Sequence, residues 1–379
     1  MDAQRLKDSF AQVAKRGGNQ VVLFFYADLF CRAPETRDMF PISMAAQRDR
    51  LLGALAQIVS NVDNVDALVP YLRRLGRDHR KFGTLAEHYG LVGVSLLTTL
   101  AHFAGDAWTD EVAADWKAAY ALVAQVMMDA AEDDGESPPW WDGTVIGHER
   151  RSIDISVLRV APLKYLPYAP GQSVAVESEL CPRTWRLFSM ANAPREDGTV
   201  DFHVRIIDGG ALSGPLARKS RPGSRLRLGP PVGSLTLGTG SGRDILMVAG
   251  STGLAPLKAL IEQVAGLAAP RRVHLFFGAE TPEALYDLPD LEKMAAQHEW
   301  LTLTHAVSGD PAHSPGYAGE RGAIADVVSR HGPWQDRDAY VCGSTAMVQA
   351  TAERLVSRGI PGSQVHIEDF GWGGGSTWS

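Results

Sequence analysis

Cysteine is scarce in this 379-residue sequence, and the few cysteines lie far apart. Cys31, Cys181 and Cys342 form no CxxC pair, so the pattern indicates neither a disulfide framework nor a zinc or iron–sulfur site. A protein of this kind fits a reducing compartment, and we expect it in the cytoplasm.

A basic cluster, an export signal and a long apolar run are also lacking. The formal net charge is -7, and without a basic cluster a nucleic-acid partner is not expected. The start, MDAQRLKDSFAQVAK, has no apolar core behind a basic flank and indicates an amphipathic helix. The longest stretch without Asp, Glu, Lys or Arg, His88 to Gly105, is broken by Ser, Thr, Gly and His, which predicts a buried helix and no transmembrane segment.

The composition is that of an ordinary globular protein, with 45% hydrophobic and 21% charged residues, and the length predicts two or three domains. As far as about Asp134 the apolar spacing of three and four residues predicts an all-α region. The stretch EDDGESPPWW (132–141) cannot continue a helix, which places a boundary near Ser137. Two apolar series show the helical spacing: Leu51, Leu55, Ile58 and Val62, and Leu91, Val94, Leu97 and Leu100.

Beyond the boundary the period changes to two, as in 153–157 and 200–206, which predicts a small antiparallel sheet or barrel. Apolar runs at 245–249, 273–278 and 339–343 then alternate with helix-like segments, which predicts a parallel sheet covered on both faces. We therefore expect three domains, at 1–136 (all-α), 143–238 (antiparallel β-barrel) and 243–371 (α/β, parallel sheet).

The segment VAGSTGLAPL (248–257) combines a buried strand, a glycine turn and the start of a helix. Glycines permit backbone approach, and free N–H groups at a helix start can hold a pyrophosphate. Taken alone, the motif fits a plain strand–turn–helix connection equally well. About sixty residues upstream, the strand-like segment Trp185-Arg186-Leu187-Phe188-Ser189 precedes it.

An Arg-x-aromatic-Ser motif, a glycine turn ending in proline and a Cys-Gly pair, in this order, resemble the ferredoxin-reductase family of flavoproteins over roughly 143–371. The resemblance implies that Arg186, Leu187, Phe188 and Ser189 bind FAD, with the guanidinium on the pyrophosphate and Ser189 near the reactive flavin nitrogen. The family usually has tyrosine at Phe188. The segment Gly209–Ser213 resembles the family's second FAD-phosphate loop, which implies cofactor contacts from Gly210 and Ser213.

For the nicotinamide nucleotide, the resemblance places Gly250, Thr252 and Gly253 at the pyrophosphate. It places Cys342 and Gly343 beside the site of hydride transfer, and Glu368 and Phe370 near the flavin. Alone, Cys342 could be an ordinary buried cysteine at a strand end. After the run at 273–278, Glu280 could accept ribose hydroxyls, and no arginine follows immediately to meet a 2′-phosphate. NADH is therefore favoured over NADPH.

The helical region resembles the globin domain of flavohaemoglobins, in which a haem-binding globin is fused to such a reductase. The resemblance rests on FFYADLF (24–30), RDMF (37–40), LGRDH (75–79) and HYGLVG (88–93). It implies haem b bound through His79 as the proximal iron ligand.

The other haem-site residues follow from the same resemblance. Phe40 would pack on the haem, Tyr26 would be the distal donor, and Gln47 and Leu51 would complete the distal pocket. Tyr89 and Asp133 occupy the positions of the family's tyrosine and glutamate beside the proximal histidine. Without the joint spacing, His79 would pass for a solvated helix residue, and Tyr26 for a packed tyrosine.

Two departures from the family pattern stand out. The segment from Phe40 to Leu51 is about three residues shorter, and Asp78 replaces a lysine. Divergent actinobacterial-type members share such changes, and that branch has been associated with D-lactate oxidation.

The leading hypothesis is that NADH reduces FAD, FAD reduces haem, and oxygen and nitric oxide are consumed to give nitrate. The alternatives are a divergent flavohaemoglobin that oxidises another donor such as D-lactate, and a gas-sensing globin that regulates the reductase. We expect a monomer or a weak oligomer.

Overall fold

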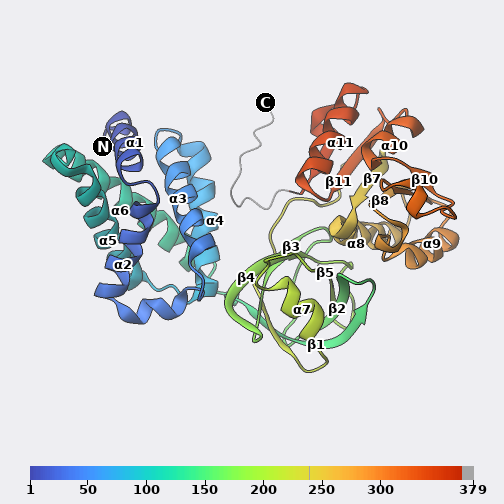
Figure 1. Ribbon diagram of the computed structural model, residues 1–379, viewed down its shortest axis with the longest axis horizontal. Helices are drawn as coiled ribbons and strands as arrows, with labels where there is room; N and C mark the ends of the chain where they lie inside the picture. Colours follow the sequence, from blue (N-terminus) through green and yellow to red (C-terminus); the bar gives the residue numbers. More distant parts are fainter. Residues whose placement is uncertain (239, 369–379) are drawn as a thin grey trace. The chain divides into compact units, whose positions relative to one another are not determined.

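The computed structural model describes residues 1–238 and 240–368, and the described chain divides into two compact units. The first, here called the helical unit, comprises Met1–Trp140, and the second, the two-sheet unit, begins at Trp141. Figure 1 shows that the helical unit contains helices alone, whereas the two-sheet unit holds a barrel-like sheet and a second sheet flanked by helices.

Six α-helices build the helical unit, and their sequences explain where several of them begin. Asp2, Asn64 and Thr109 precede helices, and each side chain accepts a hydrogen bond from a backbone N–H of the first turn, which satisfies groups that the helix leaves unpaired. The helices are α1 (Ala3–Gly17), α2 (Asn19–Arg32), α3 (Ala45–Ser60), α4 (Val65–His79), α5 (Ala86–Ala104) and α6 (Asp110–Asp133), with 3₁₀ turns at η1 (Pro34–Met39), η2 (Arg80–Phe82) and η3 (Gly105–Ala107).

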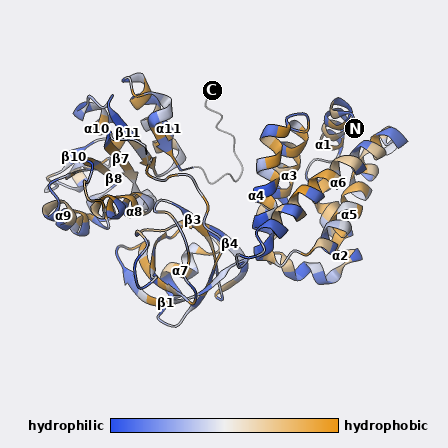
Figure 2. Cartoon of the chain, turned by 180° about the vertical axis from the view of Figure 1, so that it is seen from behind, coloured by the Kyte–Doolittle hydropathy of each residue, from blue (hydrophilic) through white to orange (hydrophobic). Residues whose placement is uncertain are grey.

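The core of the helical unit forms where the apolar faces of these helices meet, and Figure 2 shows apolar and polar residues alternating along them. Gly76 on α4 lets that helix approach α6 closely, because a Cβ at this position would overlap the backbone of Met127. The buried core residues include Leu6, Val13, Phe25, Tyr26, Leu29, Leu96, Leu100 and Trp116.

One described helical stretch, Ala86–Ala107, is long and apolar enough to cross a membrane by length and composition alone. In the structure it comprises α5 and η3, and a third (33%) of its apolar segment is buried. Leu96 and Leu100 on α5 belong to the core of the helical unit, so this helix has a packing role there.

The first sheet of the two-sheet unit is antiparallel, with the strand order β4-β3-β6-β1-β2-β5. An isolated bridge between Met190 and Phe202 links the end of β4 to β5, so the sheet curls into a partly closed barrel. Its strands are β1 (Trp141–Arg150), β2 (Ile155–Pro162), β3 (Ser173–Ser178), β4 (Cys181–Ser189), β5 (Val200–Arg205) and β6 (Arg225–Leu228), and α7 (Ser213–Lys219) lies between β5 and β6 in the chain.

The second sheet is parallel, with the order β10-β9-β8-β7-β11-β12. Its central strands are continuous apolar runs, as expected where helices cover both faces. The elements are β7 (Asp244–Gly250), η4 (Ser251–Gly253), α8 (Leu254–Ala265), β8 (Val273–Ala279), η5 (Pro282–Ala284), α9 (Leu288–Gln297), β9 (Leu301–Val307), η6 (Pro311–His313), β10 (Glu320–Arg321), α10 (Ile324–His331), β11 (Arg337–Cys342), α11 (Thr345–Ser357), η7 (Gly362–Gln364) and β12 (Val365–Ile367).

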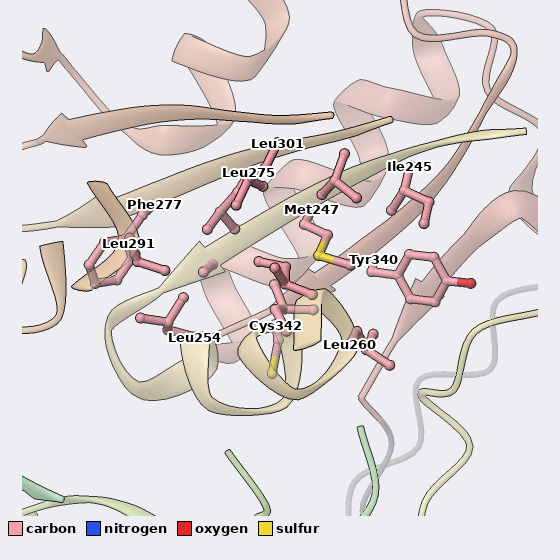
Figure 3. Packing of buried hydrophobic residues seen from close by; sticks show 14 of the residues in the cluster. Ile245, Met247, Leu254, Leu260, Leu275, Phe277, Leu291, Leu301, Tyr340 and Cys342 are labelled. Carbon is pink, nitrogen blue, oxygen red and sulfur yellow. The ribbon is translucent and has the colours of Figure 1, made fainter. Parts of the chain in front are cut away.

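The core beneath the parallel sheet consists of buried side chains. In Figure 3, side chains from β7, β8 and β11, among them Met247, Phe277 and Tyr340, pack against Leu254 and Leu260 of α8. Leu254 and Leu260 are 0% exposed, which fixes α8 and the glycine turn before it against the sheet. The expected fold class, an all-α region followed by a curled antiparallel sheet and a parallel α/β sheet, is confirmed.

Candidate functional site

His79, the expected iron ligand, is the last residue of α4 and is held by its own helix. Its Nδ1 lies 2.7 Å from the carbonyl oxygen of Leu75, and because a carbonyl can only accept, Nδ1 carries the hydrogen. Burial lowers the pKa of His79, so the imidazole is neutral. The Nε2 lone pair is then the one available to a metal, and this protonation pattern fits an axial haem ligand.

The residues expected on the distal side come together around Tyr26. The Tyr26 side chain is buried, its ring meets Phe40 edge to face at 5.4 Å, and its hydroxyl is hydrogen-bonded to the Gln47 side chain. Burial raises the pKa of Tyr26 to about 12, and the Gln47 contact offsets part of this rise. Leu51, one turn beyond Gln47 on α3, packs on the same core. The protonated phenol of Tyr26 is therefore a hydrogen-bond donor at neutral pH.

A cavity of about 250 Å³ lies against His79, between the end of α4, the start of α5 and α6. Tyr89 lines this cavity, as expected of a residue near the proximal ligand, and burial raises its pKa. The cavity wall comprises Gly76, His79, Arg80, Thr84, Ala86, Tyr89, Met128, Ala131 and Glu132.

Asp133, whose expected role beside the proximal histidine stays a prediction, is not among the residues that line this cavity. Its carboxylate is 2.6 Å from the Arg73 guanidinium, and its side chain is 57% exposed. One residue along a helix turns the side chain by about 100°, so the neighbouring Glu132 lines the cavity instead. Of the two adjacent acids, Glu132 is therefore the one that lines the cavity.

Asp78, which precedes His79, forms an ion pair with Lys81. The Lys81 side chain is 5% exposed and that of Asp78 is 15% exposed. The family has a lysine at the position of Asp78, and in this chain a lysine three residues later lies beside that aspartate. The ammonium of Lys81 therefore compensates the negative charge of Asp78.

In the two-sheet unit, four polar side chains converge from different elements. Ser189 at the end of β4 donates to Oε1 of Glu368 at 2.7 Å, and Ser173 of β3 donates to the same oxygen at 2.9 Å. The Cys342 thiol, at the end of β11, donates to Oε2 of Glu368 at 2.8 Å. Burial raises the pKa of both Glu368 and Cys342.

These contacts bring together three residues that the sequence assigns to flavin and nicotinamide binding, Ser189, Cys342 and Glu368. Ser173 was missed, because a serine in an alternating strand carries no signal of its own, and only the cross-strand pairing of Ser173 with Ser189 reveals it. The cluster joins the barrel to the parallel sheet and offers hydroxyl, thiol and carboxyl groups to a bound ring system.

The glycine turn after β7 has the close packing that the resemblance requires. A Cβ on Gly253 would overlap the carbonyl of Cys342, and a Cβ on Gly343 would overlap Met347. Gly250 and Gly343 therefore approach closely at the carboxyl ends of β7 and β11, where ligands of open α/β sheets bind. Thr252 lies within η4, directly before α8.

The expected FAD motif lies along β4. Alternation places Arg186 and Phe188 on one face of the strand and Leu187 and Ser189 on the other. The Arg186 guanidinium donates to the carbonyl of Trp185 at 2.8 Å. Phe188 is partly buried against the barrel core, with its ring 6.5 Å from that of Phe202, so one side of the ring is used in packing.

The remaining site residues lie in loops. The Ser213 hydroxyl accepts the N–H of Ile207, and the N–H of Gly210 donates to the carbonyl of Ile207, which closes a tight turn before α7. Glu280 follows β8 and is exposed. Phe370 lies outside the described residues.

Three family models match the chain in the order of its domains. They are the globin family at residues 23–127, the oxidoreductase FAD-binding domain at 142–237 and the oxidoreductase NAD-binding domain at 247–353. The globin match contains Tyr26, Phe40 and His79, the FAD-binding match contains β4, and the NAD-binding match contains the glycine turn and Cys342.

Curated relatives extend these matches over the whole chain. The flavohemoprotein of Bordetella parapertussis is 26% identical over 396 residues, covering 98% of each chain. A reductase component of a naphthalene 1,2-dioxygenase system from Pseudomonas putida is 31% identical over 237 residues, covering 61% of this chain and 69% of its own. Among solved structures, the flavohaemoglobin of Malassezia yamatoensis has a similar fold, with a TM-score of 0.78 at 17% identity over 97% of each chain.

A globin joined to FAD- and NAD-binding domains defines an oxidoreductase that combines a haem protein with a flavin reductase. Over its whole length the chain is similar to flavohaemoglobins, with the same order of globin, FAD-binding and NAD-binding domains. Its cofactors are haem, FAD and a nicotinamide dinucleotide, and the neutral imidazole of His79, the hydroxyl of Ser189 and the glycine turn are suited to them.

Proposed function

We propose that this protein is an NADH-dependent nitric oxide dioxygenase, which passes electrons through FAD to haem and consumes oxygen and nitric oxide to give nitrate. The observation that carries the proposal is the buried Tyr26 hydroxyl, hydrogen-bonded to Gln47 and beside Phe40, in the same unit as the neutral His79. The relatives named flavohemoprotein support the part of the proposal in which flavin and haem act in one chain.

When bound, the nicotinamide supplies a hydride, FAD divides the electron pair, and haem supplies one-electron oxygen chemistry. The residues of this chain orient and hold these groups. His79 is fixed in one tautomer by Leu75, so that Nε2 is presented as a ligand. Tyr26 retains its proton, because its pKa is about 12, and donates a hydrogen bond in the distal pocket.

On the reductase side, Ser189 and Glu368 hold a proton in a buried network beside Cys342. The raised pKa of Glu368 favours its protonated form, in which it can donate as well as accept. Gly250 and Gly253 admit the nicotinamide nucleotide close to the backbone. We assign the NADH preference to the exposed Glu280 after β8, which can accept ribose hydroxyls and repels a 2′-phosphate.

The test is the rate of nitric oxide consumption by the haem- and FAD-loaded protein with NADH in air. We expect Tyr26→Phe to lower this rate by about 10- to 100-fold, since a hydrogen bond to a charged group contributes about 1.5–3 kcal/mol. Reduction of ferricyanide by NADH should be unchanged in the same variant. Tyr71→Phe, which changes a tyrosine of α4 in a separate apolar cluster, is the matched control.

Two results would contradict the proposal. If the wild type and Tyr26→Phe consumed nitric oxide at the same rate, Tyr26 would not be the distal hydrogen-bond donor. Reduction of the haem by D-lactate but not by NADH, measured anaerobically from the visible spectrum, would instead assign the protein to another donor.

A further inference from the structure

Arg80, the residue after the expected iron ligand, binds the end of another helix. It begins η2 directly after His79, and its side chain is 13% exposed. One guanidinium nitrogen, Nη1, donates to the carbonyl oxygen of Asp134 at 2.7 Å and to its carboxylate at 2.5 Å. Asp134 is the C-cap of α6, so a cation lies where the last turn of that helix leaves carbonyl groups unpaired.

The same guanidinium also reaches the segment 135–140, here called the linker, which leads to β1. Nη2 of Arg80 donates to the carbonyl oxygen of Ser137 at 2.6 Å. Within the turn, the N–H of Ser137 donates to the carbonyl of Asp134 at 3.0 Å. A planar guanidinium with donors on both nitrogens therefore holds the end of α6 and the chain that leaves it in one arrangement. We call Arg80, Asp134 and Ser137 the Arg80 clamp.

Between the Arg80 clamp and β1 the chain is short and stiff. Pro138 and Pro139 follow Ser137 directly, and Trp140 alone separates them from the first residue of β1. Proline fixes φ near about −65°, and a segment of this length extends at most about 10 Å. The chain thus has little freedom between the point that Arg80 holds and the first strand of the two-sheet unit.

On its other side the Arg80 clamp is fixed to the helix that carries His79. The backbones of α4 and α6 touch one turn earlier, because a Cβ on Gly76 would overlap the backbone of Met127. His79 is itself held by the carbonyl of Leu75. Arg80 therefore joins the linker to a closely packed helix end that carries the expected iron ligand.

We propose that Arg80 is a positioning residue for electron transfer from FAD to haem, because it fastens the linker to the end of α4. NADH gives a hydride to FAD and becomes NAD⁺, and the reduced flavin passes electrons singly to ferric haem, which becomes ferrous. A short tether that is held at one end raises the effective concentration of one module at the other. The inference requires electron transfer between the two cofactors and does not depend on the nitric oxide reaction.

The experiment follows both electron-transfer steps in the haem- and FAD-loaded full-length protein, mixed anaerobically with NADH under carbon monoxide. Bleaching of the flavin absorbance reports the reduction of FAD, and the Soret band of the ferrous carbon monoxide complex reports the reduction of haem. We expect Arg80→Met to leave flavin bleaching unchanged and to slow haem reduction by about three- to tenfold, because a released linker lowers the effective concentration. The haem spectrum should not change, since His79 keeps its contact with Leu75.

Arg73→Met is the matched control, because it also breaks an ion pair between α4 and α6. The guanidinium of Arg73 lies 2.6 Å from the carboxylate of Asp133, one residue before the C-cap. Among the contacts of the described residues, none joins Arg73 to the linker, so haem reduction should keep the wild-type rate. Asp134→Asn should likewise have little effect, since both backbone carbonyls that Arg80 binds remain.

Two further measurements show whether Arg80 acts through the linker. Two glycines inserted between Ser137 and Pro138 leave the Arg80 clamp intact but loosen the connection to β1, so they should slow haem reduction as Arg80→Met does. The protein that carries both changes should be no slower than either alone. Hydrogen exchange of the loaded protein without NADH should be faster at the amide of Ser137 in Arg80→Met, which is a readout independent of turnover.

The proposal is overturned if Arg80→Met reduces haem at the wild-type rate, or if Arg73→Met slows the reduction equally. It is also overturned if the effects of Arg80→Met and of the glycine insertion multiply, or if Arg80→Met changes the haem spectrum, because Arg80 would then act on the haem site itself. None of these measurements involves nitric oxide, so they are independent of the nitric oxide assay.

Discussion

The hydroxyl oxygen of Tyr286 lies 2.7 Å from Nδ1 of His203, and the two side chains join the FAD-binding barrel to the NAD-binding sheet. His203 belongs to β5 and Tyr286 to the segment before α9, and both are buried. Burial lowers the pKa of His203 to about 3 and keeps Tyr286 protonated. The contact is thus a hydrogen bond between two neutral, buried groups.

Tyr286→Phe should destabilise the two-sheet unit, because it leaves a ring nitrogen of His203 buried without a partner. The expected cost is about 1–3 kcal/mol, seen as a lower temperature of FAD release on heating. Tyr165→Phe is the control, since Tyr165 is 67% exposed and should change little. Equal effects of the two substitutions would show that the contact contributes nothing.

His203 should also make the stability of the protein fall on acidification. An unfolded histidine takes up a proton near pH 6.5, whereas folded His203 does so only near pH 3. The unfolded chain therefore binds more protons between these values, and unfolding is favoured by about 1.4 kcal/mol per pH unit.

Replacement of His203 tests this linkage. Three buried acids have raised pKa values and therefore make the protein more stable on acidification: Glu262, Glu368 and Asp287. The informative quantity is thus the difference in pH dependence between the wild type and the His203 variant. His203→Gln should reduce the dependence of urea unfolding on pH between 6.5 and 5. An unchanged slope would contradict the assigned pKa.

Lys258→Met should be strongly destabilising, because it removes a partner from a fully buried acid. Asp287 is 0% exposed and lies 2.5 Å from the Lys258 ammonium. Loss of one partner of a buried pair costs about 3–5 kcal/mol. Lys7→Met breaks an exposed pair with Asp63 and should cost less than about 1 kcal/mol in the helical unit. Thermal unfolding of both variants measures the contrast.

Gly253→Ala should disturb the nucleotide site, because the added methyl group overlaps the carbonyl of Cys342. The turn must move away from β11, so we expect the KM for NADH in ferricyanide reduction to rise by about tenfold. Gly362→Ala, where a Cβ meets nothing within 4 Å, should leave this KM unchanged. A normal KM in Gly253→Ala would argue against nucleotide binding at this turn.

Glu132 and Asp133 allow a direct comparison of adjacent acids at the cavity beside His79. Asp133→Ala removes an exposed ion pair with Arg73, so the haem spectrum and reduction potential should not change, and stability should change by at most about 0.5 kcal/mol. Glu132→Ala removes an acid that lines the cavity and should raise the potential. A larger change in reduction potential for Asp133→Ala than for Glu132→Ala would instead support the expected role of Asp133 beside the proximal histidine.

The sequence predicts local periodicity well and long-range partners poorly. The apolar runs at 245–249 and 273–278 are strands β7 and β8 to within about two residues, because charged or glycine residues flank them. The pairing of Met190 with Phe202, which curls the barrel, is a tertiary contact with no local signal. The two-residue strand β10 was likewise missed, because it is too short to show any periodicity.

In the candidate site, too, the sequence indicates some residues and leaves the contacts of others undetermined. The side chains of Tyr26 and Gln47, far apart in the chain, are in contact, while their roles at the haem stay predictions. The role expected for Asp133 stays a prediction: its carboxylate pairs with Arg73, while Glu132 lines the cavity, and alignment without coordinates cannot fix the rotation of a helix end. Lys81 was overlooked, since within the charged stretch around His79 a solvated lysine and a buried one look identical in sequence.

The hydrogen bond from the Cys342 thiol to Glu368 has a consequence for the chemistry of the protein's sulfur. The raised pKa of Cys342 leaves almost no thiolate at neutral pH, and only the thiolate reacts with peroxides and alkylating agents. Cys31, by contrast, is exposed on α2. A maleimide dye should therefore label Cys31 and leave Cys342 unmodified, and the buried Cys342 thiol should withstand oxidants that attack an exposed cysteine.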